Sequence, residues 1–163
     1  MIVAFDPGKG GGVAYWDGEN FSLHKFTTES DYLEILESFD RNSRVYVEDV
    51  PVFVAASTSN ASSFKLGYNF GFIMGACRAF AFPVELVPPK KWQKGLQGLK
   101  PKMSYAARKR ALKDNAIRMY PALKGITNAT ADALLILDYA IKLQNTQTGA
   151  DLSVNIKSEV FLK

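Results

Sequence analysis

The sequence of 163 residues has very little of the two side chains on which many catalytic and metal sites depend: one cysteine, Cys77, and one histidine, His24. This inventory argues against a disulfide framework, a zinc site of cysteine and histidine, and a Cys-His nucleophile. A Ser-His-Asp triad would have to use His24, and the Gly-x-Ser-x-Gly motif is absent. Carboxylates, lysines and any metal ion that carboxylates hold remain as candidates for chemistry.

Long apolar runs are also missing. No stretch approaches the ~20 residues needed to cross a bilayer, and no basic region precedes an apolar segment at the N-terminus, so no signal peptide is expected. With 47% hydrophobic and 22% charged residues, the chain has enough apolar side chains for one packed domain. We therefore expect a cytoplasmic globular protein.

Charge is unevenly distributed along the chain. Residues 88–124 contain eleven basic residues and one acidic residue, Asp114, whereas the rest of the chain contains nine basic and fifteen acidic residues. The basic residues are Lys90, Lys91, Lys94, Lys100, Lys102, Arg108, Lys109, Arg110, Lys113, Arg118 and Lys124. A basic segment in an otherwise acidic chain, interspersed with Trp92 and Tyr105, favours a nucleic-acid partner. The alternative is a solvated helix and loop without a partner.

Hydrophobic periodicity and turn residues predict a mixed α/β fold. Strands are expected over residues 1–5, 13–16, 21–26, 45–48 and 83–87, and helices over 28–39, 63–79, 104–120 and 129–144. This order predicts a five-stranded sheet flanked by helices, with the first three strands antiparallel. Residues 1–144 would form the domain, and residues 145–163 a tail that is either an added strand or flexible.

A glycine-rich segment, Gly8-Lys9-Gly10-Gly11-Gly12, follows the first predicted strand. It matches neither the Walker pattern nor the dinucleotide-binding pattern, and a strand follows it where both patterns require a helix. We interpret it as a tight hairpin that lets a phosphate backbone approach Asp6 closely.

Three carboxylates occupy structurally special positions. Asp6 ends the first predicted strand, Glu48 ends the fourth, and Asp132 lies in the first turn of the last helix. Because a right-handed crossover places the first and fourth strands side by side, Asp6 and Glu48 would meet at one sheet edge. Oxygen ligands of this kind suit Mg²⁺ or Mn²⁺. Each carboxylate also has a structural interpretation: Asp6 shapes a turn, Glu48 pairs with a lysine, and Asp132 stabilises a helix start.

Four short motifs together resemble the RuvC family of Holliday junction resolvases, within the RNase H-like superfamily. They are Asp6-Pro7-Gly8, Val47-Glu48-Asp49-Val50, Ser63-Phe64-Lys65-Leu66-Gly67 and Ala131-Asp132-Ala133-Leu134-Leu135. The resemblance extends over residues 2–143, and the short length and proline-rich segment 83–92 are closer to phage-type members.

The resemblance implies a metal-dependent endonuclease that nicks two opposed strands of a four-way DNA junction as a homodimer. Asp6, Glu48 and Asp132 would be its catalytic residues and Mg²⁺ ligands, with Mn²⁺ as a substitute. The family has a fourth ligand, Asp or His, three or four residues before the last Asp. Ala129 and Asn128 stand there in this chain, which leaves Asn128 as the candidate fourth metal ligand.

The resemblance also suggests residues for DNA binding and dimerisation. Phe53 would either press on bases at the crossover or simply fill a hydrophobic gap, and the basic residue near the cut phosphate remains open. Candidate DNA contacts are Lys9, Phe53, Lys90, Lys91, Lys94, Arg108, Lys109 and Arg110. Gly67, Gly71 and Gly75 form a smooth ridge that would pack either on the sheet or, as we favour, in the dimer interface.

Two other functions remain open from the sequence. The first is a junction-binding protein with weak or no nuclease activity, because Asn128 and Ala129 replace the usual fourth ligand. The second is an RNase H-like nuclease that acts on RNA–DNA hybrids or on flaps.

Overall fold

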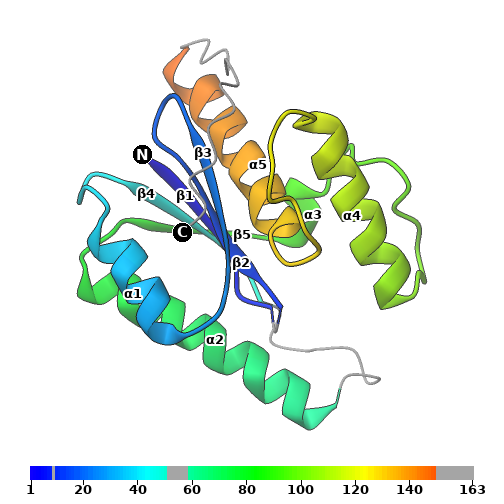
Figure 1. The fold of residues 1–163 in the computed structure, drawn as a ribbon, viewed down its shortest axis with the longest axis horizontal. Coiled ribbons are helices and arrows are strands. Elements are labelled where there is room, and N and C mark those ends of the chain that lie inside the picture. The colour runs from blue at the N-terminus through cyan, green and yellow to red at the C-terminus, as the bar shows by residue number, and fades with distance from the viewer. Residues whose placement is uncertain (9, 51–58, 150–163) are drawn as a thin grey trace.

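A mixed sheet with helices on both faces forms the protein (Figure 1). The computed structural model describes residues 1–8, 10–50 and 59–149. The strands are β1 (Ile2–Asp6), β2 (Gly12–Trp16), β3 (Phe21–Lys25), β4 (Arg44–Glu48) and β5 (Val84–Val87). The helices are α1 (Glu29–Glu37), α2 (Asn60–Ala79), α3 (Pro89–Trp92), α4 (Tyr105–Met119) and α5 (Ala131–Thr148).

The described strands lie in the order β3-β2-β1-β4-β5. β1 pairs antiparallel with β2, β2 pairs antiparallel with β3, and β1 pairs parallel with β4, which pairs parallel with β5. This arrangement confirms the expected mixed five-stranded sheet with an antiparallel start. As predicted, the carboxyl ends of β1 and β4 lie next to each other.

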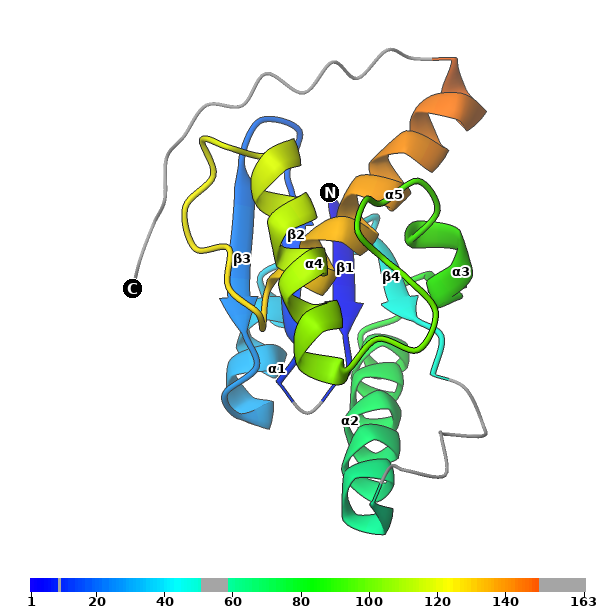
Figure 2. The same cartoon turned by 90° about the vertical axis from the view of Figure 1, so that its right-hand side faces the viewer.

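The sheet separates two hydrophobic clusters, because side chains alternate along each strand. Val3 and Phe5 of β1 face α1 and α2, where they meet Tyr32 and Ile73. On the opposite face, α5 lies directly on β1 and β2, and α4 packs against α5 (Figure 2). The resulting layers, α1 and α2, sheet, α5 and α4, bury β1 on both sides.

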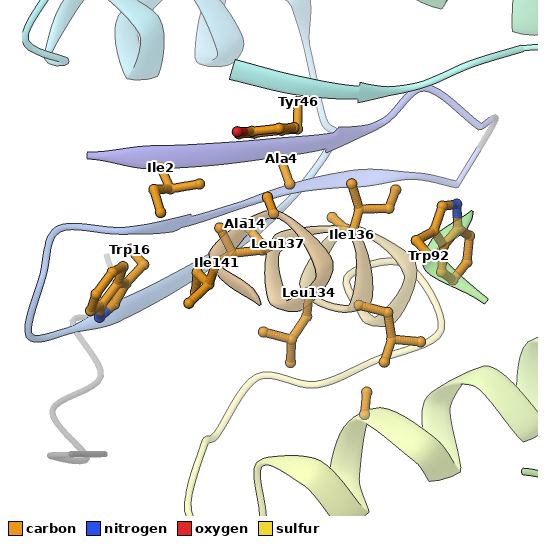
Figure 3. Close-up of a cluster of buried hydrophobic side chains, with 14 of the residues drawn as sticks. Ile2, Ala4, Ala14, Trp16, Tyr46, Trp92, Leu134, Ile136, Leu137 and Ile141 are labelled. Carbon is orange, nitrogen blue, oxygen red and sulfur yellow. The ribbon is translucent and has the colours of Figure 1, made fainter. Parts of the chain in front are cut away.

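The cluster beneath α5 is the larger of the two. Ile2, Ala4 and Ala14 from the strands meet Leu137 and Ile141 from α5 (Figure 3). The first seven residues of α5 are all at most 6% exposed, so the helix start is fixed by packing on all sides. None of the helices in the described part of the chain has the length and hydropathy to cross a bilayer.

Most element boundaries match the sequence-based prediction, with three differences. α2 begins at Asn60 because Ser59, not a later serine, accepts the capping hydrogen bond from Ser62. α5 continues to Thr148, so residues 145–148 are helical although we expected the helix to end at 144 and a tail to follow. Gly149 ends it in a left-handed conformation with φ 63°. The short helix α3 was not predicted.

Candidate functional site

Asp6 and Glu48 lie at the same edge of the sheet, each as the last residue of its strand. The register that pairs Phe5 with Val47 brings the two following residues next to each other on neighbouring parallel strands. Asp6 is only 3% exposed, and Glu48 is partly buried. The edge therefore carries two neighbouring acidic side chains, as the strand pattern predicted, and both have restricted access to water.

Asp132 reaches this edge from the first turn of α5 and is 6% exposed. The α5 start is held by Thr130, whose hydroxyl donates to the carbonyl of Gly125 at 2.8 Å. Thr130 also accepts from the backbone N–H of Thr127 at 2.9 Å. Because these bonds fix the loop and packing fixes the helix, Asp132 has a defined position relative to the strands.

Lys109 joins two of the three carboxylates. Its Nζ donates to Oδ2 of Asp132 at 2.7 Å and lies 3.5 Å from Oδ2 of Asp6. Lys109 comes from the second turn of α4, and only 16% of its side chain is exposed. We predicted that this residue would contact DNA. In the structure its ammonium group instead pairs with Asp132 and Asp6 and offsets part of the negative charge of the acidic edge.

The helical pattern of α4 contains a signal for this inward orientation. Leu112 and Ala116 are buried against α5, and Lys109 precedes them by three and seven residues, on the same face of the helix. Lys109 is thus a charged residue in a buried helix stripe. This signal was not recognised in the sequence, because Lys109 lies among many other basic residues.

The electrostatics of the site follow from burial and crowding. Burial raises the pKa of the Glu48 carboxyl, and the negative charges of Asp6 and Asp132 raise it further. Burial likewise raises the pKa of Asp132, and Asp6 adds to the effect while Lys109 opposes it. Burial would lower the pKa of Lys109, but Asp6 and Asp132 raise it above its usual range. The ammonium of Lys109 thus pairs with Asp6 and Asp132 but not with Glu48, and acidic groups outnumber it at the site.

The donor set fits a hard divalent cation. All three acidic residues offer carboxylate oxygens, and Oδ1 of Asp132 is buried without a hydrogen-bond partner among the described residues. Among the described residues, however, no three acidic, cysteine or histidine side chains surround one point closely enough to hold an ion unaided. The carboxylate oxygens are therefore suitable ligands for a divalent cation, but the carboxylates of Asp6 and Asp132 are paired with the Lys109 ammonium.

The turn after Asp6 is held in place by short hydrogen bonds and by a helix. The backbone N–H of Gly8 donates to Oδ1 of Asp6 at 2.9 Å, and that of Gly11 donates to the carbonyl of Gly8 at 2.8 Å. Asn69, buried on α2, donates from Nδ2 to the carbonyl of Pro7 at 3.3 Å. Sequence analysis missed Asn69, whose signal is an amide one helical turn from the buried Ile73.

The other predicted DNA contacts lie along α3 and α4. Lys90, Lys91 and Lys94 are exposed on and just after α3, and Arg110 is exposed on α4. Arg108 hydrogen-bonds to Gln93 and contributes positive charge near Asp132. Tyr105 is 74% exposed, but Trp92 is buried beneath α3 and is not available for stacking. Basic side chains thus border the acidic edge.

The remaining predicted site residues have different outcomes. Asn128 is exposed in the loop before α5, in a cavity lined also by Lys109. Lys9 and Phe53 lie outside the described residues.

The α2 glycine ridge faces away from the rest of the described chain. A Cβ added at Gly67, Gly71 or Gly75 would meet nothing within 4 Å, so the ridge does not pack on the sheet. On the same helix, Phe64 and Tyr68 are 75% and 52% exposed, with ring centroids 6.4 Å apart. This end of α2 projects beyond the sheet (Figures 1 and 2).

Comparison with known proteins identifies the architecture. No family model and no curated protein sequence matches the chain. A structure of RuvC from Thermus thermophilus in complex with a Holliday junction substrate is 21% identical, covers 87% of this chain and 95% of its own, and has a TM-score of 0.57. A second T. thermophilus RuvC structure is 20% identical, covers 91% and 96%, and has a TM-score of 0.54. The protein therefore has the RNase H-like fold of RuvC over most of its length.

Proposed function

We propose that this protein is a metal-dependent, structure-selective DNA endonuclease that resolves four-way junctions by paired nicks. The observation that carries the proposal is the convergence of Asp6, Glu48 and Asp132 at one sheet edge bordered by basic α3 and α4. The fold shared with RuvC, one structure of which holds a Holliday junction substrate, supports the same conclusion. The protein would be a crossover junction endodeoxyribonuclease of the cytoplasm, in a bacterium or a phage-infected cell.

The three carboxylates would hold Mg²⁺, with Mn²⁺ as a substitute and Asn128 as the proposed fourth ligand. Bound metal would activate water and stabilise charge on the cut phosphodiester. The chain's own part is to fix the oxygens: strand ends hold Asp6 and Glu48, and the buried start of α5 holds Asp132. Lys109 supplies positive charge beside a bound phosphate once its ammonium is released from Asp132.

DNA would bind over the exposed basic residues next to this edge. Lys90, Lys91, Lys94 and Arg110 are exposed, so they are available to phosphates. For Lys9 and Phe53, DNA contact remains a proposal from the family resemblance.

The proposed molecule is a homodimer that joins through α2. The bare glycine ridge permits close approach of a second helix, and exposed Phe64 and Tyr68 add apolar area that the described chain leaves uncovered. A dimer would present two acidic sites to the two strands of a junction.

The experiment that tests the function is a cleavage assay with end-labelled DNA. It compares a four-way junction, a Y-fork, a linear duplex and an RNA–DNA hybrid, each with Mg²⁺, Mn²⁺ or EDTA. Paired metal-dependent nicks in the junction are expected, and Asp6→Asn should abolish them while junction binding remains. Tight binding without cleavage in any metal would instead indicate a junction-binding protein, and preferred cutting of hybrids would indicate an RNase H-like activity.

A further inference from the structure

An open cavity of ≈ 770 Å³ lies beside the acidic edge, between α4, the turn after β1 and the loop before α5. Side chains from separate parts of the chain line it: Lys25, Tyr105, Lys109, Arg110, Lys113 and Asn128. Neither Lys25 nor Lys113 belongs to the site predicted from the sequence. Lys25 also lies outside the basic segment 88–124, so the fold brings a lysine that is distant in sequence next to residues of this segment.

The cavity is strongly cationic. Among the described residues, four basic side chains and one acidic side chain, Asp114, line it. Lys109 is engaged with Asp6 and Asp132, whereas Lys25, Arg110 and Lys113 make no ion pair within the described part of the chain. Three cations without an ion pair, opposed by the single carboxylate of Asp114, favour a ligand with a delocalised negative charge, such as a phosphate.

The strand register fixes where this hollow lies relative to the carboxylates. Asp6 pairs with Gly12 across β1 and β2, and Gly12 pairs with Lys25 across β2 and β3. Two strand spacings place the backbones of Asp6 and Lys25 about 10 Å apart along the same sheet edge. A phosphate bound near Lys25 is therefore a different group from the phosphate cut beside Asp6. The two are close enough to belong to the same polynucleotide strand.

The two places are connected through Lys109, which lines the cavity and also contacts Asp6 and Asp132. Tyr105, one helical turn before Lys109, is largely exposed at the cavity wall and offers a ring face to a sugar or base. A DNA strand that lies along this wall would pass from the cationic residues of the cavity to the acidic edge.

We propose that this cavity binds a second phosphate of the DNA strand being cut, and so determines which phosphodiester reaches the carboxylates. Lys25 and Lys113 would be positioning residues, since they contact the strand away from the reacting bond. The inference rests on the proposed function, but it concerns binding and register and does not depend on the rate of cleavage.

The test is a methylphosphonate scan of a four-way junction. Single neutral linkages are placed at successive positions along the strand, and binding of the full chain is measured by fluorescence anisotropy in EDTA. One position away from the cut phosphate should lower wild-type affinity about fivefold. Lys25→Gln and Lys113→Gln should each weaken binding to unmodified DNA, and in these variants the same modification should have little further effect because its partner is already lost.

Lys124→Gln is the matched control, because it removes one charge from an exposed residue of the basic segment that does not line the cavity. It should retain the full methylphosphonate effect. A scan whose pattern is the same in wild type and in both cavity variants would overturn the inference.

Failure of this inference can be told apart from failure of the proposed function. If methylphosphonate sensitivity depends on Lys25 and Lys113 but no metal supports cleavage, the phosphate site is supported and the nuclease function is contradicted. If the protein makes paired junction nicks but its methylphosphonate sensitivity does not depend on Lys25 and Lys113, the nuclease function is supported and the phosphate site is contradicted. With active protein, the cavity variants should also scatter the nicks over neighbouring phosphodiesters, whereas Lys124→Gln should not.

Discussion

Nζ of Lys109 lies 2.7 Å from Oδ2 of Asp132, and this ion pair joins the second turn of α4 to the first turn of α5. The same ammonium lies 3.5 Å from Asp6 on β1. One positive charge thus holds three elements together around carboxylates that would repel each other without it. In the metal-free protein, Lys109 performs part of the neutralisation that a divalent cation would perform.

Replacing Lys109 should therefore strengthen metal binding. In Lys109→Met the cation no longer competes with an ammonium, and we expect Mn²⁺ affinity to rise about tenfold, or about 1.4 kcal/mol. In EDTA the same variant should lose about 2 kcal/mol of stability, because buried carboxylates remain without a partner. Isothermal titration calorimetry and urea unfolding measure both effects. Lys124→Gln is the control, and unchanged Mn²⁺ affinity in Lys109→Met would contradict the role of Lys109.

The turn after Asp6 should tolerate substitution at one glycine and not at the next. A Cβ on Gly11 would lie 2.0 Å from the carbonyl oxygen of Asp6, whereas a Cβ on Gly10 would meet nothing within 4 Å. Gly11→Ala should cost about 3 kcal/mol of stability, because the backbone beside Asp6 must move. Gly10→Ala should change stability by less than about 0.5 kcal/mol. Urea unfolding compares the two, and equal losses would show that the turn is not constrained as described.

The only histidine in the sequence gives a pH prediction that can be assigned to one group. His24 stacks on Tyr15 with ring centroids 5.6 Å apart, and burial lowers the pKa of its imidazole below 6.5. Protonation therefore favours the unfolded chain. The contribution to stability is complete above pH 6.5, and it is lost as pH falls through 6.5 toward the lower folded-state pKa.

An NMR titration of the single imidazole should give a pKa below 6.5. Urea unfolding of the wild type between pH 7.5 and pH 5 should also show a larger loss of stability than unfolding of His24→Asn. A normal pKa, or identical pH dependence of the two proteins, would contradict the burial of His24.

The exposed aromatic pair on α2 should control the proposed dimer. Phe64→Asp with Tyr68→Asp would place two charges on the face beside the glycine ridge, and we expect at least a tenfold weaker dimer by sedimentation analysis. Leu33→Asp on α1 is the matched control, since Leu33 is another exposed apolar helix residue away from that face. A monomeric wild type, or equal effects of the two changes, would contradict the proposed α2 interface.

Much of the fold was predictable because local patterns and tertiary structure agree. The apolar run that ends at Asp6, the buried run that ends at Glu48 and the capping box of Thr28 and Asp31 each indicate an element that the structure contains. Helix α3 was missed because Pro88 and Pro89 indicate a break, whereas Pro89 in fact occupies the first helical position, where no backbone N–H is needed.

The electrostatic partners at the site were less predictable, because they depend on contacts between distant residues. Lys109 is separated from Asp6 by 103 positions, and Lys25 reaches the same edge only through the register of three strands. The sequence indicated that a basic segment exists. Which of its members faces inward depends on how α4 packs on α5, and this rotation follows from Leu112 and Ala116 once the core is known.

Because the first turns of α5 are completely buried, the side chains of the site differ in how far they can move. Asp132 cannot adapt by a movement of its helix without disturbing the core, and Asp6 is held by its strand and by the amide of Gly8. Lys109, by contrast, has a long side chain with four rotatable bonds on a helix at the outer layer. Induced fit on arrival of metal or DNA would therefore be confined largely to one lysine side chain, with the carboxylates as the rigid frame.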